Sequence, residues 1–436
     1  MSASASTRNG VVDGAPPAAT GRVLVLCFDG TNELYGAQNT NVVKFFELLK
    51  KNDKSKQMVY YQPGIGTYLD PHMWSPLLLS LAKMADLAVA WYLDAHIMGG
   101  YKFLMQYYKA GDRVCLFGFS RGAYTARCLA GMLHKVGLLP PGMVEQVSFA
   151  YSMYKDTSTK GVQLSKGFKQ AFSIDVPIHF MGVWDTVASV GVLWARHLPF
   201  TSSNNFVRTF RHAMSLDEHR ARFQLNKWHN DDPSKANSSM DPERASPAPG
   251  GAPAAKAPIG GFQNVHTSGY RRLEDQPQTD VMEVWFSGCH TDVGGSAVVD
   301  SVTHALSNNP LRWMINECNR TNSGVLFDEA AVQQSGLFPD SSTTAASNAE
   351  QDALSDIHDM LKTKPLWWPL EFVPFEREWQ DSEGKWKRNF WPNVFRPRYI
   401  RPPPSPLLMH ISVKQRMDAG NYKPRPKYTG EPIWTE

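Results

Sequence analysis

The sequence has few cysteines, and they lack the patterns of a disulfide-rich or zinc-binding protein. The five thiols are Cys27, Cys115, Cys128, Cys289 and Cys318. Their number is odd, no pair has the spacing of a metal site, and three of them lie in or beside apolar, strand-like runs. Such cysteines are typical of reduced, buried thiols in a reducing compartment. We therefore expect no disulfide framework, no metal and no cofactor.

Long uninterrupted hydrophobic runs are also missing. The longest apolar stretch, 76–97, contains Lys83, Asp86 and Asp94. Charges at that spacing suit an amphipathic or buried helix rather than a membrane span. Residues 1–20 are rich in Ser, Ala, Gly and Pro and have no apolar segment like that of a secretory signal, which predicts a disordered leader. With neither a signal peptide nor a transmembrane segment, we expect a cytoplasmic location.

The sequence has only a small excess of positive over negative charge. The 436 residues carry a formal net charge of only +4. Proteins that bind nucleic acid usually present a dense basic face, so we do not expect nucleic acid as a partner. The excess is local, because residues 364–436 hold thirteen Lys or Arg against eight Asp or Glu, among many aromatic residues. The solvated face of a folded segment explains this balance, and the alternative is contact with an anionic membrane surface.

Apolar runs alternate with helix-like segments through the first 330 residues. Five runs have the length and composition of buried parallel strands: 22–28, 58–62, 113–117, 176–184 and 281–289. The alternation predicts an α/β fold, with a doubly wound, mainly parallel sheet and helices on both faces. Reactive side chains of such sheets gather at the carboxyl ends of the strands, and a functional site is therefore expected there.

A serine flanked by glycines lies between one of these strands and a helix. The segment Gly118-Phe119-Ser120-Arg121-Gly122 follows the apolar run at 113–117 and precedes a helix-like run at 123–130. A sharp strand–turn–helix connection strains the serine backbone and exposes its hydroxyl, while small flanking residues let strand and helix approach closely. The pattern predicts that Ser120 is a nucleophile. The alternative is a tight glycine turn with an inert serine.

A nucleophilic serine needs a base to take its proton and an acid to orient that base. In α/β hydrolases these follow the serine in the order Asp or Glu, then His. Asp185 and His290 occur in this order, each at the end of its own predicted strand. The alternative acids are Asp292 and Asp217, the latter in a helix-like segment at 214–220. Asp185 could instead cap the helix that follows it.

The oxyanion of an acyl-transfer intermediate needs two backbone N–H donors. One is expected from Arg121, directly after the nucleophile. The second is expected from the loop at the end of the first strand, where Gly30 permits close approach. The side chains of Asp29 and Thr31 are expected to support this loop by hydrogen bonds.

Five motifs in this sequence together resemble one protein family. They are Phe-Asp-Gly-Thr at 28–31, Gly-Ile-Gly-Thr at 64–67, Leu-Phe-Gly-Phe-Ser-Arg-Gly-Ala at 116–123, Gly-Val-Trp-Asp-Thr-Val at 182–187 and Phe-Ser-Gly-Cys-His-Thr-Asp-Val-Gly-Gly at 286–295. The set is similar to the α/β hydrolases that include bacterial type VI secretion phospholipase effectors and fungal homologues. The resemblance covers residues 21–330.

The resemblance implies an α/β-hydrolase fold and a triad at Ser120, Asp185 and His290. It implies ester hydrolysis firmly and phospholipid specificity loosely. We accordingly expect a catalytic domain at 21–330 with a disordered insertion at 230–261. An aromatic and proline-rich extension at 331–436 is expected to pack on the core, with short strands or hairpins in its first part.

The sequence thus predicts a serine hydrolase that cleaves carboxylic esters, with lipid or phospholipid esters among the candidates. One alternative is a metal-dependent phosphohydrolase, in which Asp29, Asp185, His290 and Asp292 bind a divalent cation. Cys27 argues against it, because it occupies the place of the nucleophilic aspartate of such enzymes. The other alternative is a non-catalytic binding protein on a hydrolase scaffold.

Overall fold

The computed structural model describes most of the chain. The described ranges are 21–30, 35–64, 78–187, 198–201, 206–228, 278–339, 342–383, 385–402, 406–420 and 422–436. The predicted leader at 1–20 and the predicted insertion at 230–261 lie outside them. Across these ranges, none of the helices combines the length and the apolar composition needed to span a bilayer.

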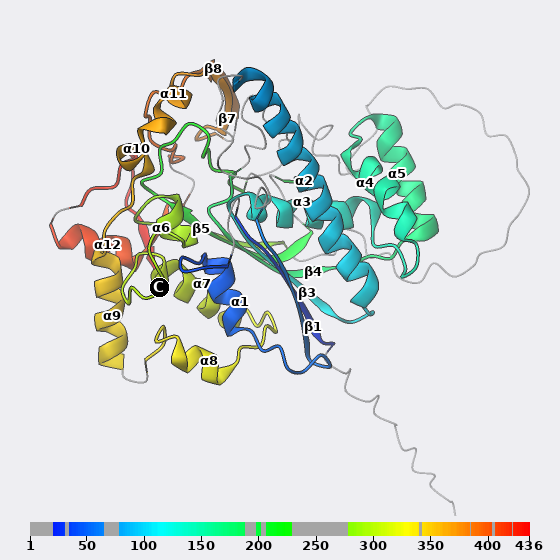
Figure 1. The fold of residues 1–436 in the computed structure, drawn as a ribbon, viewed down its shortest axis with the longest axis horizontal. Coiled ribbons are helices and arrows are strands. Elements are labelled where there is room, and N and C mark those ends of the chain that lie inside the picture. The colour runs from blue at the N-terminus through cyan, green and yellow to red at the C-terminus, as the bar shows by residue number, and fades with distance from the viewer. Residues whose placement is uncertain are drawn as a thin grey trace, which may run out of the picture.

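An eight-stranded sheet forms the centre of the molecule (Figure 1), in the order β10-β9-β6-β5-β4-β3-β1-β2. Its strands are β1 (Val23–Phe28), β2 (Gln57–Gln62), β3 (Arg113–Phe119), β4 (Ile178–Trp184), β5 (Val207–Ser215), β6 (Asp280–Phe286), β9 (Leu408–His410) and β10 (Ile433–Thr435). Neighbouring strands run parallel at each pairing between the described strands. The predicted α/β architecture is therefore confirmed.

Helices cover both faces of this sheet (Figure 1). One face carries α2 (Leu78–Tyr107), α3 (Ser120–Val136), α4 (Val147–Lys155) and α5 (Thr159–Phe172). The other carries α1 (Asn41–Leu48), α7 (Asn308–Arg320) and α8 (Glu329–Gln334). The remaining helices are α6 (His290–Gly294), α9 (Ser342–Leu354), α10 (Met360–Thr363), α11 (Trp368–Glu371) and α12 (Ile411–Asp418).

The core divides into two layers because successive strand residues point to opposite faces. On β1, Leu24, Leu26 and Phe28 belong to the layer under α2 and α3. Their neighbours Val23 and Val25 belong to the layer under α1 and α7. A strand buried on both faces must be apolar at every position, which explains the uninterrupted apolar run in the sequence.

The sequence analysis did not predict β5, nor the short C-terminal strands β9 and β10 of the same sheet. The segment 214–220, expected to be helix-like, is the end of β5 followed by a turn. The polar residues Arg211 and His212 interrupt the apolar pattern of β5, yet both are buried. Arg211 pairs with Glu317 of α7, and His212 pairs with Glu283 of β6. Because both side chains have polar partners, they are buried in a strand that the apolar pattern alone could not reveal.

The C-terminal residues extend the same sheet. Strands β9 and β10 add to its β6 edge, and Met409 packs in a third apolar cluster with Trp285. An antiparallel hairpin of β7 (Phe375–Gln380) and β8 (Trp386–Trp391) lies apart from this sheet, at the upper edge in Figure 1. The division at residue 330 stays a prediction, although the sheet itself continues beyond it.

Gly122 permits the closest approach between β1 and α3. A Cβ at this position would lie 2.2 Å from the carbonyl oxygen of Phe28 and 2.4 Å from that of Asp29. Because both obstacles are backbone atoms, Gly122→Ala should displace β1 or α3 and cost about 1–3 kcal/mol of unfolding free energy. Urea unfolding of the variant measures this loss.

Gly167 of α5 provides the matched control. It is an exposed helical glycine with no atom within 4 Å of a Cβ built on it. Gly167→Ala should stabilise the protein by about 0.5–1 kcal/mol, because alanine loses less backbone entropy in a helix. Equal unfolding midpoints for the two variants would contradict the packing argument.

Candidate active site

Ser120 occupies a strained turn between β3 and α3. Its backbone has φ = 58°, in the left-handed region that side chains other than glycine rarely adopt. Gly118 and Gly122 make the turn possible, since a Cβ on Gly118 would lie 2.6 Å from the carbonyl oxygen of Gly122. A strained backbone at the turn from strand to helix is the geometry expected of a nucleophilic serine.

The structure brings together the three side chains that the sequence analysis selected. His290 Nε2 lies 2.8 Å from Ser120 Oγ, and His290 Nδ1 lies 2.5 Å from Asp185 Oδ2. All three residues are buried. They meet because Ser120, Asp185 and His290 follow β3, β4 and β6 at the carboxyl edge of one parallel sheet.

Asp292 makes hydrogen bonds to residues next to His290 rather than to its ring. Its carboxylate accepts hydrogen bonds from the N–H groups of Cys289 and His358, at 2.8 and 3.0 Å. The first of these bonds closes the N-terminus of α6, whose first residue is His290. Within the described residues, Asp292 makes no hydrogen bond to the His290 ring, so these contacts do not place it as the triad acid that the sequence offered as an alternative.

Aromatic rings fix the plane of His290. The ring centroid of Phe119 lies 4.6 Å from that of His290, and Phe223 presents an edge at 4.8 Å. Gly294 leaves room for Phe119, since a Cβ there would lie 1.9 Å from its ring. These contacts also exclude water, and burial lowers the pKa of His290 against the raising effect of Asp185. The imidazole is thus kept neutral and able to accept a proton.

Besides His290, two other segments of the chain donate hydrogen bonds to Asp185. The N–H of Ser215 donates to Oδ1 at 2.8 Å, and the guanidinium of Arg398 donates to both carboxylate oxygens at 2.6 and 2.9 Å. Burial alone would raise the pKa of Asp185, but Arg398 and His290 outweigh it and hold that pKa well below its usual range. The carboxylate is therefore ionised.

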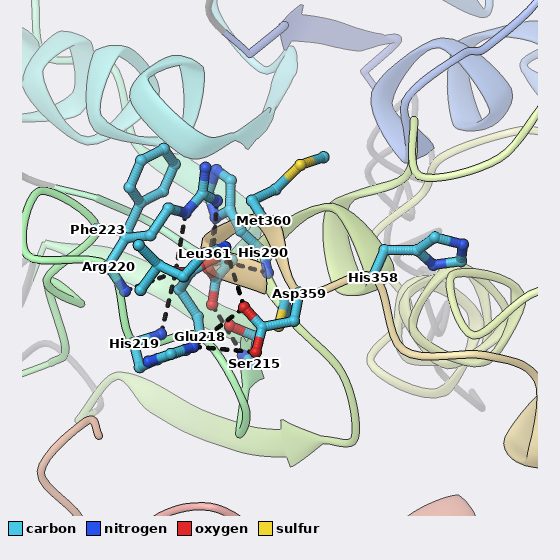
Figure 2. Close-up of polar contacts among 12 residues, drawn as sticks. Ser215, Glu218, His219, Arg220, Phe223, His290, His358, Asp359, Met360 and Leu361 are labelled. Carbon is cyan, nitrogen blue, oxygen red and sulfur yellow. Dashed lines mark hydrogen bonds and ion pairs between the residues drawn. The ribbon is translucent and has the colours of Figure 1, made fainter. Parts of the chain in front are cut away.

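Sequence reasoning missed two arginines at this site. Arg398 is 213 residues from Asp185, and its signal in the sequence is only a basic residue between Pro397 and Tyr399. Arg220 pairs with Glu218 at 2.7 Å, and its guanidinium lies 3.4 Å from the centroid of the Phe223 ring. Figure 2 shows this pair beside His290. Asp359 and Leu361 of the C-terminal segment (residues 331–436) lie in the same cluster.

The loop after β1 lies against the turn at Ser120, since a Cβ on Gly122 would contact the carbonyl oxygens of Phe28 and Asp29. Burial raises the pKa of Asp29 to about 6, although hydrogen bonds from Tyr61, Thr40 and the Gly30 N–H oppose this shift. The Gly30 N–H already donates to Asp29 Oδ1, at 2.7 Å. Its role as the second oxyanion donor stays a prediction. Thr31 lies outside the described residues. The first donor, Arg121, stands in the first turn of α3, where backbone N–H groups have no helical partner.

The alternative acid and the alternative metal site find no support in these contacts. Asp217 accepts hydrogen bonds from the Gly288 N–H and the Tyr422 hydroxyl, and no bond joins it to His290. Among the described residues, no group of three or more His, Cys, Asp or Glu side chains is arranged to hold a metal ion.

Comparison with known proteins adds independent information. The sequence model of the family described as "T6SS, Phospholipase effector Tle1-like, catalytic domain" matches residues 22–317. An uncharacterized protein of Saccharomyces cerevisiae is 30% identical, and the match covers 92% of this chain and 79% of the yeast protein.

Two solved structures are similar at lower identity. An uncharacterized protein from Pseudomonas aeruginosa has a TM-score of 0.40 and 19% identity, over 78% of this chain and 52% of that one. The chain thus spans about half the length of that protein. The Tle1 effector, solved bound to the VgrG spike of the type VI secretion system, has a TM-score of 0.35 and 12% identity, over 89% and 96% of the two chains.

The contact between His358 and Asp292 generates a pH-dependent prediction. The hydrogen bond to Asp292 raises the pKa of His358, and the pair lies 2.7 Å apart. A pKa raised in the folded state stabilises the fold fully below the unfolded value of about 6.5, and this gain is lost as the pH rises through the folded value. His358→Gln should therefore lower the melting temperature more at pH 6 than at pH 9.

His96 is the control with the opposite sign. Burial lowers its pKa to about 4, so the folded protein keeps it neutral while the unfolded chain protonates it below about pH 6.5. His96→Gln should thus be less damaging at pH 6 than at pH 9. A pH-independent effect of His358→Gln on the melting temperature would refute the proposed ion pair.

Proposed function

Because this chain belongs to the family of Tle1-like phospholipase effector catalytic domains, we propose that it is a serine hydrolase that cleaves carboxylic esters of lipids. The observation that carries the proposal is the continuous hydrogen-bonded chain from Ser120 through His290 to Asp185. Family membership supports hydrolysis of lipid esters, and the side-chain geometry supports the acyl-enzyme route to it.

In the proposed mechanism, Ser120 Oγ attacks the ester carbonyl while His290 Nε2 takes its proton. Asp185 holds the Nδ1–H tautomer of the ring and stabilises the imidazolium that forms. The negative oxygen of the tetrahedral intermediate is stabilised by the Arg121 N–H and by the positive end of α3. Collapse expels the alcohol, which receives the proton from His290, and leaves the acyl group on Ser120.

Water completes the cycle by the same steps. His290 takes a proton from water as the oxygen attacks the acyl-enzyme, and returns it to Ser120 Oγ as the carboxylic acid leaves. No step needs a metal or an organic cofactor, since the base, the nucleophile and the oxyanion donors all come from this chain. The five free, buried cysteines fit a reducing compartment such as the cytoplasm.

The segment at 364–436 supports contact with a membrane surface. Trp368, Phe390 and Trp391 are 49%, 69% and 58% exposed, and the exposed basic residues Lys387 and Arg388 lie on the same strand, β8, as Phe390 and Trp391. Aromatic rings with nearby cations suit the boundary between anionic headgroups and acyl chains. Trp367, adjacent to Trp368, packs on Phe223, which contacts His290. This surface would therefore hold the active site close to a lipid substrate.

A fluorophosphonate probe tests the nucleophile, because it labels only serines activated by a base. Wild type should be labelled and Ser120→Ala should not, with a loss of ester hydrolysis of at least about 10⁴-fold. Ser152→Ala, at an exposed serine that bonds within its own helix, is the control and should label like wild type. Equal labelling of wild type and Ser120→Ala would disprove the mechanism.

Vesicle binding tests the membrane surface. Alanine at Trp368, Phe390 and Trp391 together should reduce co-sedimentation with phosphatidylcholine vesicles containing phosphatidylglycerol, and should leave hydrolysis of a short soluble ester unchanged. Leu164→Ala with Phe172→Ala is the matched control, because these α5 residues are similarly exposed, at 52% and 51%. If the control reduced sedimentation as strongly, the assignment to this surface would be wrong.

A further inference from the structure

Arg398 is buried behind the proposed triad and comes from the distant end of the chain. It is 4% exposed. Besides both oxygens of Asp185, its Nη1 donates to the carbonyl oxygen and the hydroxyl of Ser215 at 3.1 and 2.7 Å, and its Nη2 donates to the carbonyl oxygen of Phe223 at 2.8 Å. The guanidinium thus ties together the end of β4, the end of β5 and the loop that packs against His290.

This ion pair is not explained by stability alone. Both partners are removed from water, and replacing a buried pair by apolar residues is often neutral or stabilising. A guanidinium also fixes direction as well as charge, because its two parallel N–H groups match the two oxygens of a carboxylate. The contact of Arg398 with both oxygens of Asp185 therefore points to a role in orienting this carboxylate.

We propose that Arg398 is a positioning residue, which locks the Asp185 carboxylate so that Oδ2 faces His290 Nδ1 and the imidazole keeps its reactive tautomer and orientation. The inference rests on the proposed serine-hydrolase function and deepens it. It also makes the C-terminal segment part of the active site, since Arg398 lies well beyond residue 317, where the family match ends.

The alignment of donors around Asp185 supports this role. Oδ1 accepts from Ser215 N–H and Arg398, and Oδ2 accepts from Arg398 and His290. With both oxygens held from behind, the carboxylate cannot rotate about its bond to Cβ without breaking two charge-assisted hydrogen bonds. Only the Oδ2 side remains directed at the imidazole, and so the ring has one favourable orientation.

The charge of Arg398 also acts on His290, because both donate to the same oxygen atom. The positive guanidinium partly offsets the negative carboxylate, and the Glu218–Arg220 pair is similarly balanced. The charged or titratable groups around His290 on the described elements are Asp185, Asp217, Glu218, His219, Arg220, Cys289, Asp292, His358, Asp359 and Arg398. Removing Arg398 leaves a net negative charge beside the ring, which favours the imidazolium.

The test measures hydrolysis of a soluble p-nitrophenyl ester by the full chain against pH. Arg398→Met should lower kcat about 10- to 100-fold with little change in KM, and should move the acid limb of kcat/KM to higher pH. Arg398→Lys keeps the charge but not the two-point contact, so it should lower kcat while leaving the acid limb near its wild-type position.

Arg312→Met is the matched control. It removes a partly buried arginine that pairs with Asp352 at 2.5 Å, with no contact to the triad. It should reduce thermal stability while keeping the wild-type pH profile. If Arg398→Met and Arg398→Lys instead both kept the wild-type kcat and acid limb, the positioning role would be overturned.

Two further measurements separate positioning from folding. Proton NMR should show the His290 Nδ1–H as a far-downfield resonance in wild type, and Arg398→Met should shift or broaden it. In Arg398→Ala, millimolar guanidinium chloride should restore part of the activity by occupying the vacated position. An unchanged resonance in Arg398→Met together with no rescue of Arg398→Ala would overturn the inference.

The two proposals fail in different ways. If wild type hydrolysed no ester and Ser120 escaped the fluorophosphonate probe, the proposed function would fail, and with it the catalytic meaning of Arg398. If wild type were active and labelled but the Arg398 variants behaved like Arg312→Met, only the positioning role would fail.

Discussion

The carboxylate of Asp185 is the point at which the separate parts of this molecule meet. It receives hydrogen bonds from the backbone at the end of β5, from the imidazole at the start of α6 and from an arginine near the C-terminus. A buried carboxylate without such donors would cost several kcal/mol or take up a proton, and then neither the site nor the packing around it would persist. The segments that supply the donors are therefore constrained together, although 183 residues separate Ser215 from Arg398.

Strain and close packing sharpen the same site. Ser120 and Asp185 both have positive φ, at 58° and 42°, which costs of order 1–3 kcal/mol each. The surrounding elements offset this cost, since Gly122 lets α3 contact the backbone of β1 and Gly294 lets α6 contact Phe119. In the proposed function, the nucleophile Ser120 and the acid Asp185 are thus fixed before a substrate arrives, which favours fast proton transfer.

The C-terminal segment contributes to three parts of the molecule. It lengthens the sheet through β9 and β10, it supplies Arg398 and His358 to the residues around His290, and it exposes the aromatic surface of β8 and α11. In the proposed function these contributions are connected. A hydrolase of lipid esters must hold its reactive serine near the membrane–water interface while its histidine base stays buried away from water. A single segment that both lines the site and meets the surface couples these two needs.

The sequence by itself determined the parallel α/β architecture, the glycine-flanked turn at Ser120 and the order of Ser120, Asp185 and His290. Each of these leaves a local mark: an uninterrupted apolar run, glycines at fixed offsets, or a reactive residue at a strand end. Only the tertiary structure decided the strand character of 207–215, the engagement of the Gly30 N–H by Asp29, and the partners of Asp185. From the sequence alone, charged residues such as Arg211 and Arg398 are expected at the surface. Their burial depends on partners that lie far along the chain and are brought near only by folding.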